Sequence, residues 1–306
     1  MAGITAGEAL KAGAALLRSA GIDTPFLDAS LLLGEILRLD RAGLILAEGT
    51  PLSPETRSLF DQSLKRRLSG ECVAWILGRR EFRGLDFIVG PQVLVPRPDT
   101  ETLVEAALEF IDLRGAKFPE GGLLAPLSVL EIGTGSGAVA VSLKAERPAL
   151  MVSASDISPP ALDLARSNAQ RLLGKADGVN FISGSLFDGI AGFFDLVLSN
   201  PPYVPTALLE TLAPEVRREP RIALDGGSDG LDLIRPIIAG APEHLRPGGM
   251  LLLEADPGQM PAIAALLTRQ GYRNIRVFQD LSGRDRVIGG IPSGGPRQKN
   301  AVTGIL

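Results

Sequence analysis

The chain of 306 residues contains few of the residue types that build disulfides and metal clusters. It has one cysteine, Cys72, and one histidine, His244. A single cysteine excludes an internal disulfide and a cysteine-based metal cluster, and a single histidine cannot build a histidine-based one. We therefore predict no metal site. A lone cysteine is typical of a reducing compartment, and His244 is expected near the end of a helix.

The chain also lacks a basic excess and long apolar runs. Its 31 Lys and Arg residues face 35 Asp and Glu residues, for a net charge of −4. This balance argues against a protein dedicated to nucleic-acid binding, which usually presents a basic face. No apolar run reaches transmembrane length, and no secretory signal is expected at the N-terminus. We expect a cytoplasmic monomer that binds neither a membrane nor nucleic acid directly.

The first part of the chain predicts a small helical domain over residues 1–78. Apolar residues make up 45% of the whole chain, and its length gives room for about two domains. Ser53-Pro54-Glu55 combines an N-cap, a first-turn proline and a first-turn acid, which together indicate a helix start. The sequence leaves open whether this domain only buttresses the rest or grips a macromolecular substrate.

Residues 81–89 alternate in polarity around a glycine and predict a β-hairpin, within a connector over residues 79–98. Arg97 and Thr100, just before the next helix, either cap and pair locally or line the mouth of a cofactor cavity. The segment 292–306 is rich in glycine, proline and polar residues and is expected to be a mobile tail.

Residues 99–291 are expected to form an α/β domain. Strands and helices alternate, which predicts a doubly wound, mostly parallel sheet with crossover helices. In such sheets ligands bind at the carboxyl ends of the strands. The expected strands are 128–132, 150–155, 179–182, 194–198, 250–253, 274–279 and 286–288, and the expected helices are 103–113, 138–145, 159–173, 231–245 and 260–269.

The fourth expected strand ends in Asn200-Pro201-Pro202-Tyr203. Each proline lacks an N–H and restricts the residue before it, so the strand stops and the chain stays extended. The Asn200 side-chain oxygen and the Pro201 carbonyl can each accept one N–H of a planar NH2 group, with the Tyr203 ring beside it. That arrangement suits methylation of an amide-like nitrogen, whose orientation must be fixed. The alternative is a proline-rich turn that only ends a strand.

A glycine-rich turn, Gly133-Thr134-Gly135-Ser136-Gly137, connects the first expected strand to a helix. Glycines permit the tight turn and let the backbone approach a ligand closely. The Gly-x-Gly-x-Gly spacing differs from the dinucleotide pattern, and the lysine of a P-loop is missing. Glu131, just before the turn, suits a cationic or amine-bearing ligand better than a pyrophosphate.

Two further strand ends carry candidate ligand-binding residues. Asp156, followed by Ile157, lies about 20 residues beyond the glycine turn, where an acid accepts the ribose hydroxyls of a nucleoside. Asp156 and Ser158 equally fit a helix cap. Leu186 and Phe187 follow the third strand, and they either flank an adenine ring or belong to the core.

Together these motifs resemble the HemK/PrmC family of class I S-adenosylmethionine-dependent methyltransferases, over nearly the whole chain. The resemblance is carried by the stretches Glu81–Leu85, Val95–Glu101, Glu131–Gly137, Asp156–Ser158, Ser199–Tyr203, Glu219–Gly227 and Gly283–Arg286.

The resemblance implies an enzyme of translation termination. It would transfer a methyl group from S-adenosyl-L-methionine to the side-chain amide nitrogen (N5) of the glutamine in the Gly-Gly-Gln motif of class I peptide chain release factors. Asn200, Pro201, Pro202 and Tyr203 would be catalytic. The alternatives are an adenine-N6 nucleic-acid methyltransferase and a ribosomal-protein glutamine methyltransferase. The implied cofactor-binding residues are Gly133, Thr134, Gly135, Ser136, Gly137, Asp156, Ile157, Leu186, Phe187 and Asn200.

Overall fold

The computed structural model describes residues 3–116, 126–174 and 178–294. It divides the chain into two compact units. The first, which we call the helical unit, comprises Met1–Arg80, Val89–Pro91 and Leu212–Arg218. The second, the sheet unit, comprises Glu81–Ile88, Gln92–Thr211 and Glu219–Leu306.

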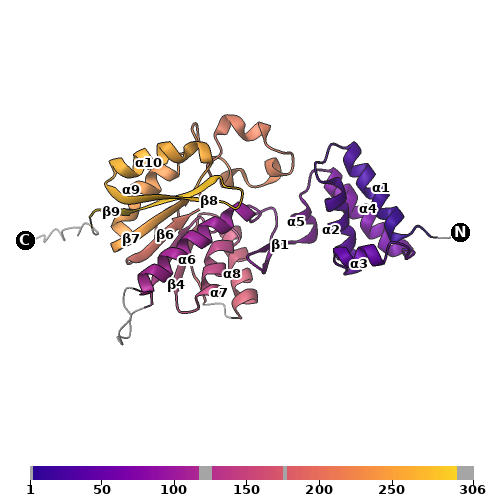
Figure 1. Ribbon diagram of the computed structural model, residues 1–306, viewed down its shortest axis with the longest axis horizontal. Helices are drawn as coiled ribbons and strands as arrows, with labels where there is room; N and C mark the ends of the chain where they lie inside the picture. The colour runs from indigo at the N-terminus through magenta and orange to yellow at the C-terminus, as the bar shows by residue number, and fades with distance from the viewer. Residues whose placement is uncertain (1–2, 117–125, 175–177, 295–306) are drawn as a thin grey trace, which may run out of the picture. The chain divides into compact units, whose positions relative to one another are not determined.

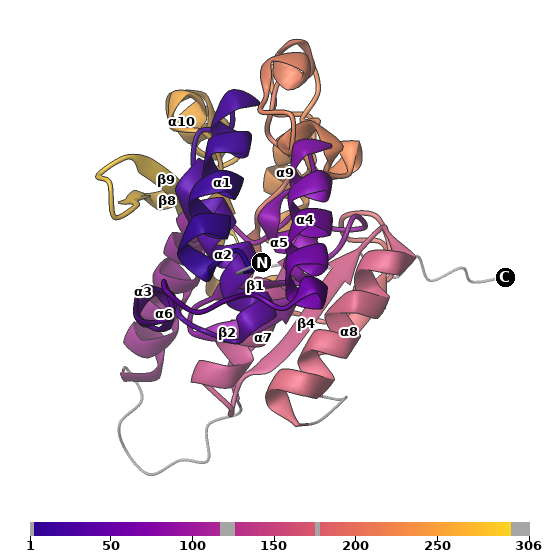
Figure 2. The same cartoon turned by 90° about the vertical axis from the view of Figure 1, so that its right-hand side faces the viewer.

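The helical unit packs its longer helices around an apolar core. Helices α1, α2 and α4 contact one another (Figure 2). The Ser53 hydroxyl accepts a hydrogen bond from the Thr56 backbone N–H and Pro54 is the first residue of α4, so the predicted helix start is confirmed. The two short helices, α3 and α5, were not predicted. The helices are α1 (Ala6–Ser19), α2 (Pro25–Leu37), α3 (Arg41–Leu46), α4 (Pro54–Leu68) and α5 (Val73–Leu77).

The sheet unit contains a seven-stranded, mostly parallel sheet in the order β5-β4-β3-β6-β7-β9-β8. Strand β9 runs antiparallel to both of its neighbours. The strand order reverses between β3 and β6, which is the place where open α/β sheets bind ligands. The predicted fold class is confirmed. The strands are β3 (Ser128–Ile132), β4 (Met151–Asp156), β5 (Asn180–Ser183), β6 (Phe194–Ser199), β7 (Leu245–Glu254), β8 (Tyr272–Gln279) and β9 (Asp285–Pro292).

Helices cover both faces of this sheet (Figure 1). Helices α6 (Glu101–Ala116), α7 (Ala138–Glu146) and α8 (Pro159–Leu173) lie on one face, and α9 (Ile234–His244) and α10 (Met260–Arg269) lie on the other. His244 is the last residue of α9, as predicted. None of the described helices is both long and apolar enough to cross a bilayer.

The predicted hairpin is present as β1 (Arg79–Phe82) and β2 (Leu85–Ile88). Several boundaries differ from the prediction, and two of them by four residues or more. Strand β7 starts at Leu245 and not at Met250, because Leu245 pairs with Phe194 and a register shift follows that pair. Pro292, predicted to open the mobile tail, is the last residue of β9, while residues 295–306 of that tail lie outside the described residues.

Candidate functional site

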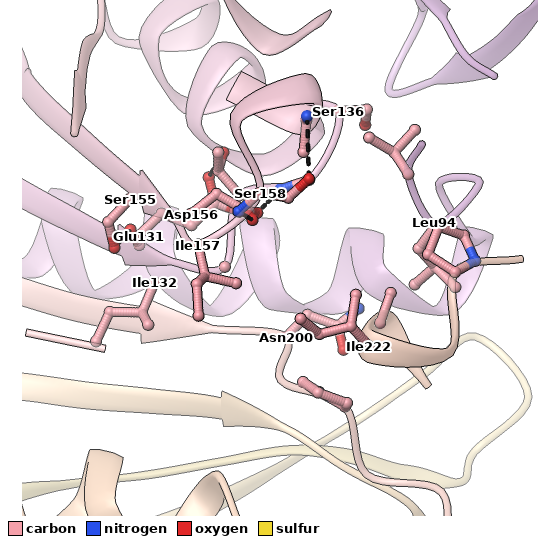
Figure 3. A pocket seen from close by; sticks show the side chains of 18 of the residues that line it. Leu94, Glu131, Ile132, Ser136, Ser155, Asp156, Ile157, Ser158, Asn200 and Ile222 are labelled. Carbon is pink, nitrogen blue, oxygen red and sulfur yellow. Dashed lines mark hydrogen bonds between the residues drawn. The ribbon is translucent and has the colours of Figure 1, made fainter. Parts of the chain in front are cut away.

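A cavity of about 350 Å³ lies in the sheet unit, at the carboxyl ends of β3, β4 and β6. Figure 3 shows Asp156 and Asn200, which come from different strand ends, among its lining side chains. Of the described residues predicted for the site, four do not line the cavity: Gly137, Phe187, Pro201 and Tyr203. Those that do are Gly133, Thr134, Gly135, Ser136, Asp156, Ile157, Leu186, Asn200 and Pro202.

The glycine turn needs its glycines for backbone conformation. Gly133 and Gly135 have φ angles of +75° and +55°, where a side chain would strain the backbone. A Cβ atom at either position would meet no protein atom within 4 Å, so packing does not demand glycine there. At Gly137 a Cβ would come within 3.2 Å of the Ala165 Cβ on α8. Gly137 therefore permits close helix packing, which explains why it does not line the cavity.

Glu131 holds the turn in place from beneath. Its side chain is buried, and Oε2 accepts hydrogen bonds from the Thr134 hydroxyl at 2.7 Å and from the Ala140 backbone N–H at 3.0 Å. Burial raises the pKa of this carboxyl group to about 8, although the two hydrogen bonds act in the opposite direction. The structure does not test the prediction that Glu131 suits a cationic ligand. It shows that the Oε2 atom already accepts two hydrogen bonds from the protein.

Asp156 contributes to the helix start, one of the two roles that the sequence left open, and the other role stays a prediction. Its Oδ2 accepts from the Gly135 backbone N–H at 2.8 Å, and its Oδ1 accepts from the Ser158 N–H at 2.9 Å. The Ser158 hydroxyl in turn accepts from the Ala161 N–H at the start of α8. Each carboxylate oxygen can accept a second hydrogen bond, so Asp156 can also bind a ligand hydroxyl in the cavity that it lines.

The structure separates Leu186 from Phe187. Leu186 has a φ of +51°, unusual for a residue with a side chain, and lines the cavity. The Phe187 ring instead stacks on the His244 imidazole, with 4.6 Å between centroids and 6° between planes. It also packs against the core beside Gly240, where a Cβ would lie only 2.7 Å from the ring. The contacts of Phe187 are therefore those of a core residue, as one of the two predicted alternatives had it.

Asn200 is held by one specific hydrogen bond. Its Nδ2 atom donates to the Thr100 hydroxyl oxygen at 3.1 Å, which leaves Oδ1 as the acceptor of this side chain. Thr100 and Arg97 both line the cavity, so the pocket-lining alternative holds for them. Tyr203 is partly buried against the core, and burial raises the pKa of its hydroxyl above the ordinary value.

Long-range contacts bring the remaining motifs together. Buried Glu219 accepts hydrogen bonds from the Val95 N–H at 3.1 Å and from the Arg97 guanidinium at 2.6 Å. The Gly226 N–H donates to the Val204 carbonyl at 2.9 Å, next to a Val204–Asp225 bridge. The stretch 219–227 thereby fixes both the segment before α6 and the segment after Asn200, a relation that the sequence alone did not predict.

Glu254, the last residue of β7, is the site residue that the sequence reasoning missed. Its side chain is 1% exposed. Burial raises the pKa of this carboxyl group to about 7, while the neighbouring Thr100 hydroxyl and the charge of Arg286 lower it. One signal was available: a single acid follows the apolar run Met250–Leu253 at the end of an expected strand.

Comparison with known proteins places this site in a family. Residues 8–78 match the PrmC N-terminal domain, and residues 122–213 match the Methyltransferase small domain. The catalytic domain of hMettl16 in complex with MAT2A 3'UTR hairpin 1 aligns with a TM-score of 0.55 at 15% identity. The alignment covers 78% of this chain and 82% of that one, and at this identity it shows the fold alone.

Two relatives match almost end to end. The release factor glutamine methyltransferase of Geobacter sulfurreducens is 44% identical over 276 residues, covering 90% of this chain and 92% of that protein. The release factor glutamine methyltransferase of Deinococcus radiodurans is 42% identical over 281 residues, covering 92% of this chain and 96% of that protein. The chain therefore belongs to the release factor glutamine methyltransferase family.

Proposed function

We propose that this chain transfers a methyl group from S-adenosyl-L-methionine to the side-chain amide nitrogen (N5) of the glutamine in the Gly-Gly-Gln motif of class I peptide chain release factors. The observation that carries the proposal is that Asn200 lines the same cavity as Asp156 and the glycine turn. An acceptor for amide N–H groups and a nucleoside-type subsite therefore share one enclosed space. Family membership supports the same reaction.

The cavity lining fits the proposed cofactor. Asp156 offers carboxylate oxygens to ribose hydroxyls, and Leu186 and Ile157 offer apolar surface to the adenine ring. Gly133 and Gly135 leave the space beside the turn open for the methionine part. When bound, S-adenosylmethionine supplies a strongly electrophilic methyl group, so the protein's task is mainly alignment.

On the acceptor side, the protein must orient a poor nucleophile. The lone pair of an amide nitrogen is delocalised, and hydrogen bonds that hold both N–H groups favour the more positive, more pyramidal nitrogen of the transition state. Asn200 Oδ1 takes one N–H, and the sequence predicts the Pro201 carbonyl as the acceptor of the other, although Pro201 is not among the residues that line the cavity. Tyr203 acts from the core, since its ring does not line the cavity.

We extend the proposal to the helical unit, which we expect to bind the release factor away from the Gly-Gly-Gln motif. Helix α2 exposes three large apolar side chains: Phe26, Leu27 and Leu31. We expect the double substitution Leu27→Asp and Leu31→Asp to raise KM for the release factor about tenfold, as loss of an apolar contact patch would, without weakening cofactor binding. Leu281→Asp, at a fully exposed leucine of the sheet unit, is the matched control. An unchanged KM in the double variant would mean that the helical unit only supports the rest of the chain and does not bind the release factor.

The test of the main proposal is methyl transfer from labelled S-adenosylmethionine to purified release factor. The parallel substrates are the same factor with its Gly-Gly-Gln glutamine replaced, and DNA. We expect label on the intact factor and on neither control. Label on DNA alone would contradict the proposal in favour of an adenine-N6 methyltransferase. A cytoplasmic monomer, acting where translation takes place, is part of the same proposal.

A further inference from the structure

The backbone after β6 is covered closely by a loop that contains two glycines facing it. We call residues 200–203 the acceptor segment. A Cβ atom at Gly226 would lie 2.8 Å from the Pro202 carbonyl oxygen, and one at Gly230 would lie 2.2 Å from the Tyr203 carbonyl oxygen. Neither distance leaves room for a side chain. The loop backbone therefore lies directly against carbonyl groups of the acceptor segment.

The acceptor segment has few backbone donors with which to hold itself in place. Pro201 and Pro202 have no N–H to donate. The segment also follows the last pair between β6 and β7, which joins Ser199 to Leu253. Hydrogen bonds to its carbonyl oxygens are therefore the main way in which the rest of the protein can fix its backbone.

The Gln259 side chain makes such a hydrogen bond. Its Nε2 atom donates to the Tyr203 carbonyl oxygen at 2.9 Å and to the Asp229 carbonyl oxygen at 3.3 Å. Its Oε1 atom accepts from the Asp256 backbone N–H at 3.2 Å. Carbonyl groups only accept and the N–H only donates, so these partners determine which end of the amide is the nitrogen. One side chain thus connects the acceptor segment, the covering loop and the turn after β7.

A helix cap accounts for only half of this arrangement. Asp256 and Gln259 form a capping box at the 3₁₀ turn Pro257–Gln259, in which the Gln259 side chain accepts from the Asp256 N–H. Glutamate serves in that position as well as glutamine does. The cap therefore requires the oxygen alone, whereas the two donated hydrogen bonds go to the covering loop and to the acceptor segment.

We propose that Gln259 is a positioning residue for methyl transfer: by holding the Tyr203 carbonyl, it fixes the acceptor segment and with it the direction of Asn200 Oδ1. This inference deepens the proposed function and depends on it. The Asn200 amide nitrogen is held by the Thr100 hydroxyl at 3.1 Å, but its Oδ1 atom must meet the substrate N–H. If the backbone that carries Asn200 shifted by about 1 Å, the loss of alignment would cost up to about 100-fold in rate.

Gln259→Glu is the first test, because it keeps an oxygen for the capping box and removes both donors. We expect kcat on release factor to fall by about 10- to 100-fold. The dissociation constant of S-adenosylmethionine, measured by calorimetry, should stay within about threefold. Gln279→Glu makes the same change at an exposed glutamine whose amide donates to Asp285, and it should keep a native kcat. A native kcat in Gln259→Glu would overturn the proposal.

Gln259→Met separates loss of the donors from repulsion between the introduced carboxylate and the carbonyl oxygens. It removes the donors without adding a charge, so kcat should still fall by about tenfold, with cofactor affinity unchanged. A native kcat in this variant would show that only the introduced charge mattered and would also overturn the proposal. If Gln259→Glu fails to fold, Gln259→Met decides in its place.

The deciding readout is a double-mutant cycle with Asn200→Ala. If Gln259 acts through the direction of Oδ1, its substitution should cost less than about threefold in the variant that lacks this oxygen, because coupled residues are not additive. A merely structural role predicts the same fold-loss in both backgrounds, and that result would contradict the proposal. Absence of methyl transfer from the native protein to the release factor would instead refute the proposed function.

Discussion

Two buried glutamates lie near the ends of strands: Glu131 lines the cavity, and Glu254 does not. On the cofactor side, Glu131 of β3 binds the Thr134 hydroxyl and the Ala140 backbone N–H. On the proposed acceptor side, Glu254 of β7 is buried, and its Oε2 atom has no hydrogen-bond partner among the described residues. The first acid therefore stabilises a loop and a helix start, whereas the second stabilises no backbone segment through hydrogen bonds to this oxygen.

The two sides should therefore respond differently to substitution. The cofactor side is shaped largely by the main chain, through the positive φ angles of the glycine turn and the N–H groups bound by acids. The proposed acceptor side depends on a side-chain hydrogen bond, from the Asn200 amide to the Thr100 hydroxyl. We expect substitutions on the cofactor side to change cofactor affinity, and substitutions on the acceptor side to change kcat.

Asn200→Ala should give the largest effect and most directly tests this division. Removing the orienting acceptor should lower kcat on release factor by about 10²- to 10³-fold, the loss typical of one preorganised hydrogen-bonding group. The dissociation constant of S-adenosylmethionine should change by less than about threefold. Steady-state kinetics and calorimetry on the same preparation measure both. A near-native kcat would remove Asn200 from the proposed mechanism.

Asp156→Ala should produce the opposite pattern. The variant loses an acceptor for the proposed ribose hydroxyls and for the Gly135 N–H, so cofactor affinity should fall by about 10- to 100-fold. With saturating cofactor, kcat should stay much closer to native than in Asn200→Ala. Asp163→Ala, which removes an exposed acid of α8, is the control. Calorimetry that finds equal affinity in both variants would contradict the ribose assignment.

Glu131→Gln should change the pH dependence of stability. Burial raises the pKa of Glu131 to about 8 from 4.5, so between these values the folded chain keeps a proton that the unfolded chain releases. The free energy of unfolding therefore falls as pH rises through this range. Glutamine cannot ionise, so the free energy of unfolding of the variant should rise relative to that of the native chain between about pH 5 and pH 9. Urea titrations measure this difference.

The same titration on Glu254→Gln sharpens the comparison of the two acids. The pKa of Glu254 is raised only to about 7. The increase in the free energy of unfolding of Glu254→Gln over the native chain should therefore level off nearer neutral pH than that of Glu131→Gln. A difference between variant and native that does not change with pH would mean that the acid concerned is charged in the folded chain.

Phe187→Leu should have the smallest effect. The stack on His244 and part of a core contact are lost, so the free energy of unfolding should fall by about 1 kcal/mol. Cofactor affinity should not change, because the ring does not line the cavity. Leu186→Ala, at the adjacent cavity-lining residue, should weaken affinity. The reverse pattern in calorimetry would mean that Phe187, and not Leu186, borders the adenine ring.

Local signals explain what the sequence could predict. Helix α8 begins and ends as expected because Pro159 and Gly174 determine its ends regardless of distant contacts. Strand β3 also matches, since its residues are all buried and the glycine turn stops it. The residues at the strand ends were found in the same way, because a parallel sheet brings those ends to one edge.

Contacts between distant residues explain what could not be predicted. Strand β7 extends back to Leu245 only because β6 provides a partner there. Phe187 turns away from the cavity because α9 presents His244 to it. The hydrogen bond from Asn200 to Thr100 joins two segments that are 100 residues apart in the chain. No local pattern encodes such a contact.

The helical unit includes Leu212–Arg218, so it cannot be complete until these late residues have been synthesised. Buried Arg67 of α4 binds Asp28 at 2.7 Å and Glu215 at 3.0 Å, and Glu215 lies 148 residues later. At about 5 to 20 residues per second, the ribosome needs roughly 7 to 30 seconds to supply that second carboxylate. During this interval the buried guanidinium of Arg67 has one of its two carboxylate partners, Asp28, so the helical unit completes these ion pairs only after much of the sheet unit has been synthesised.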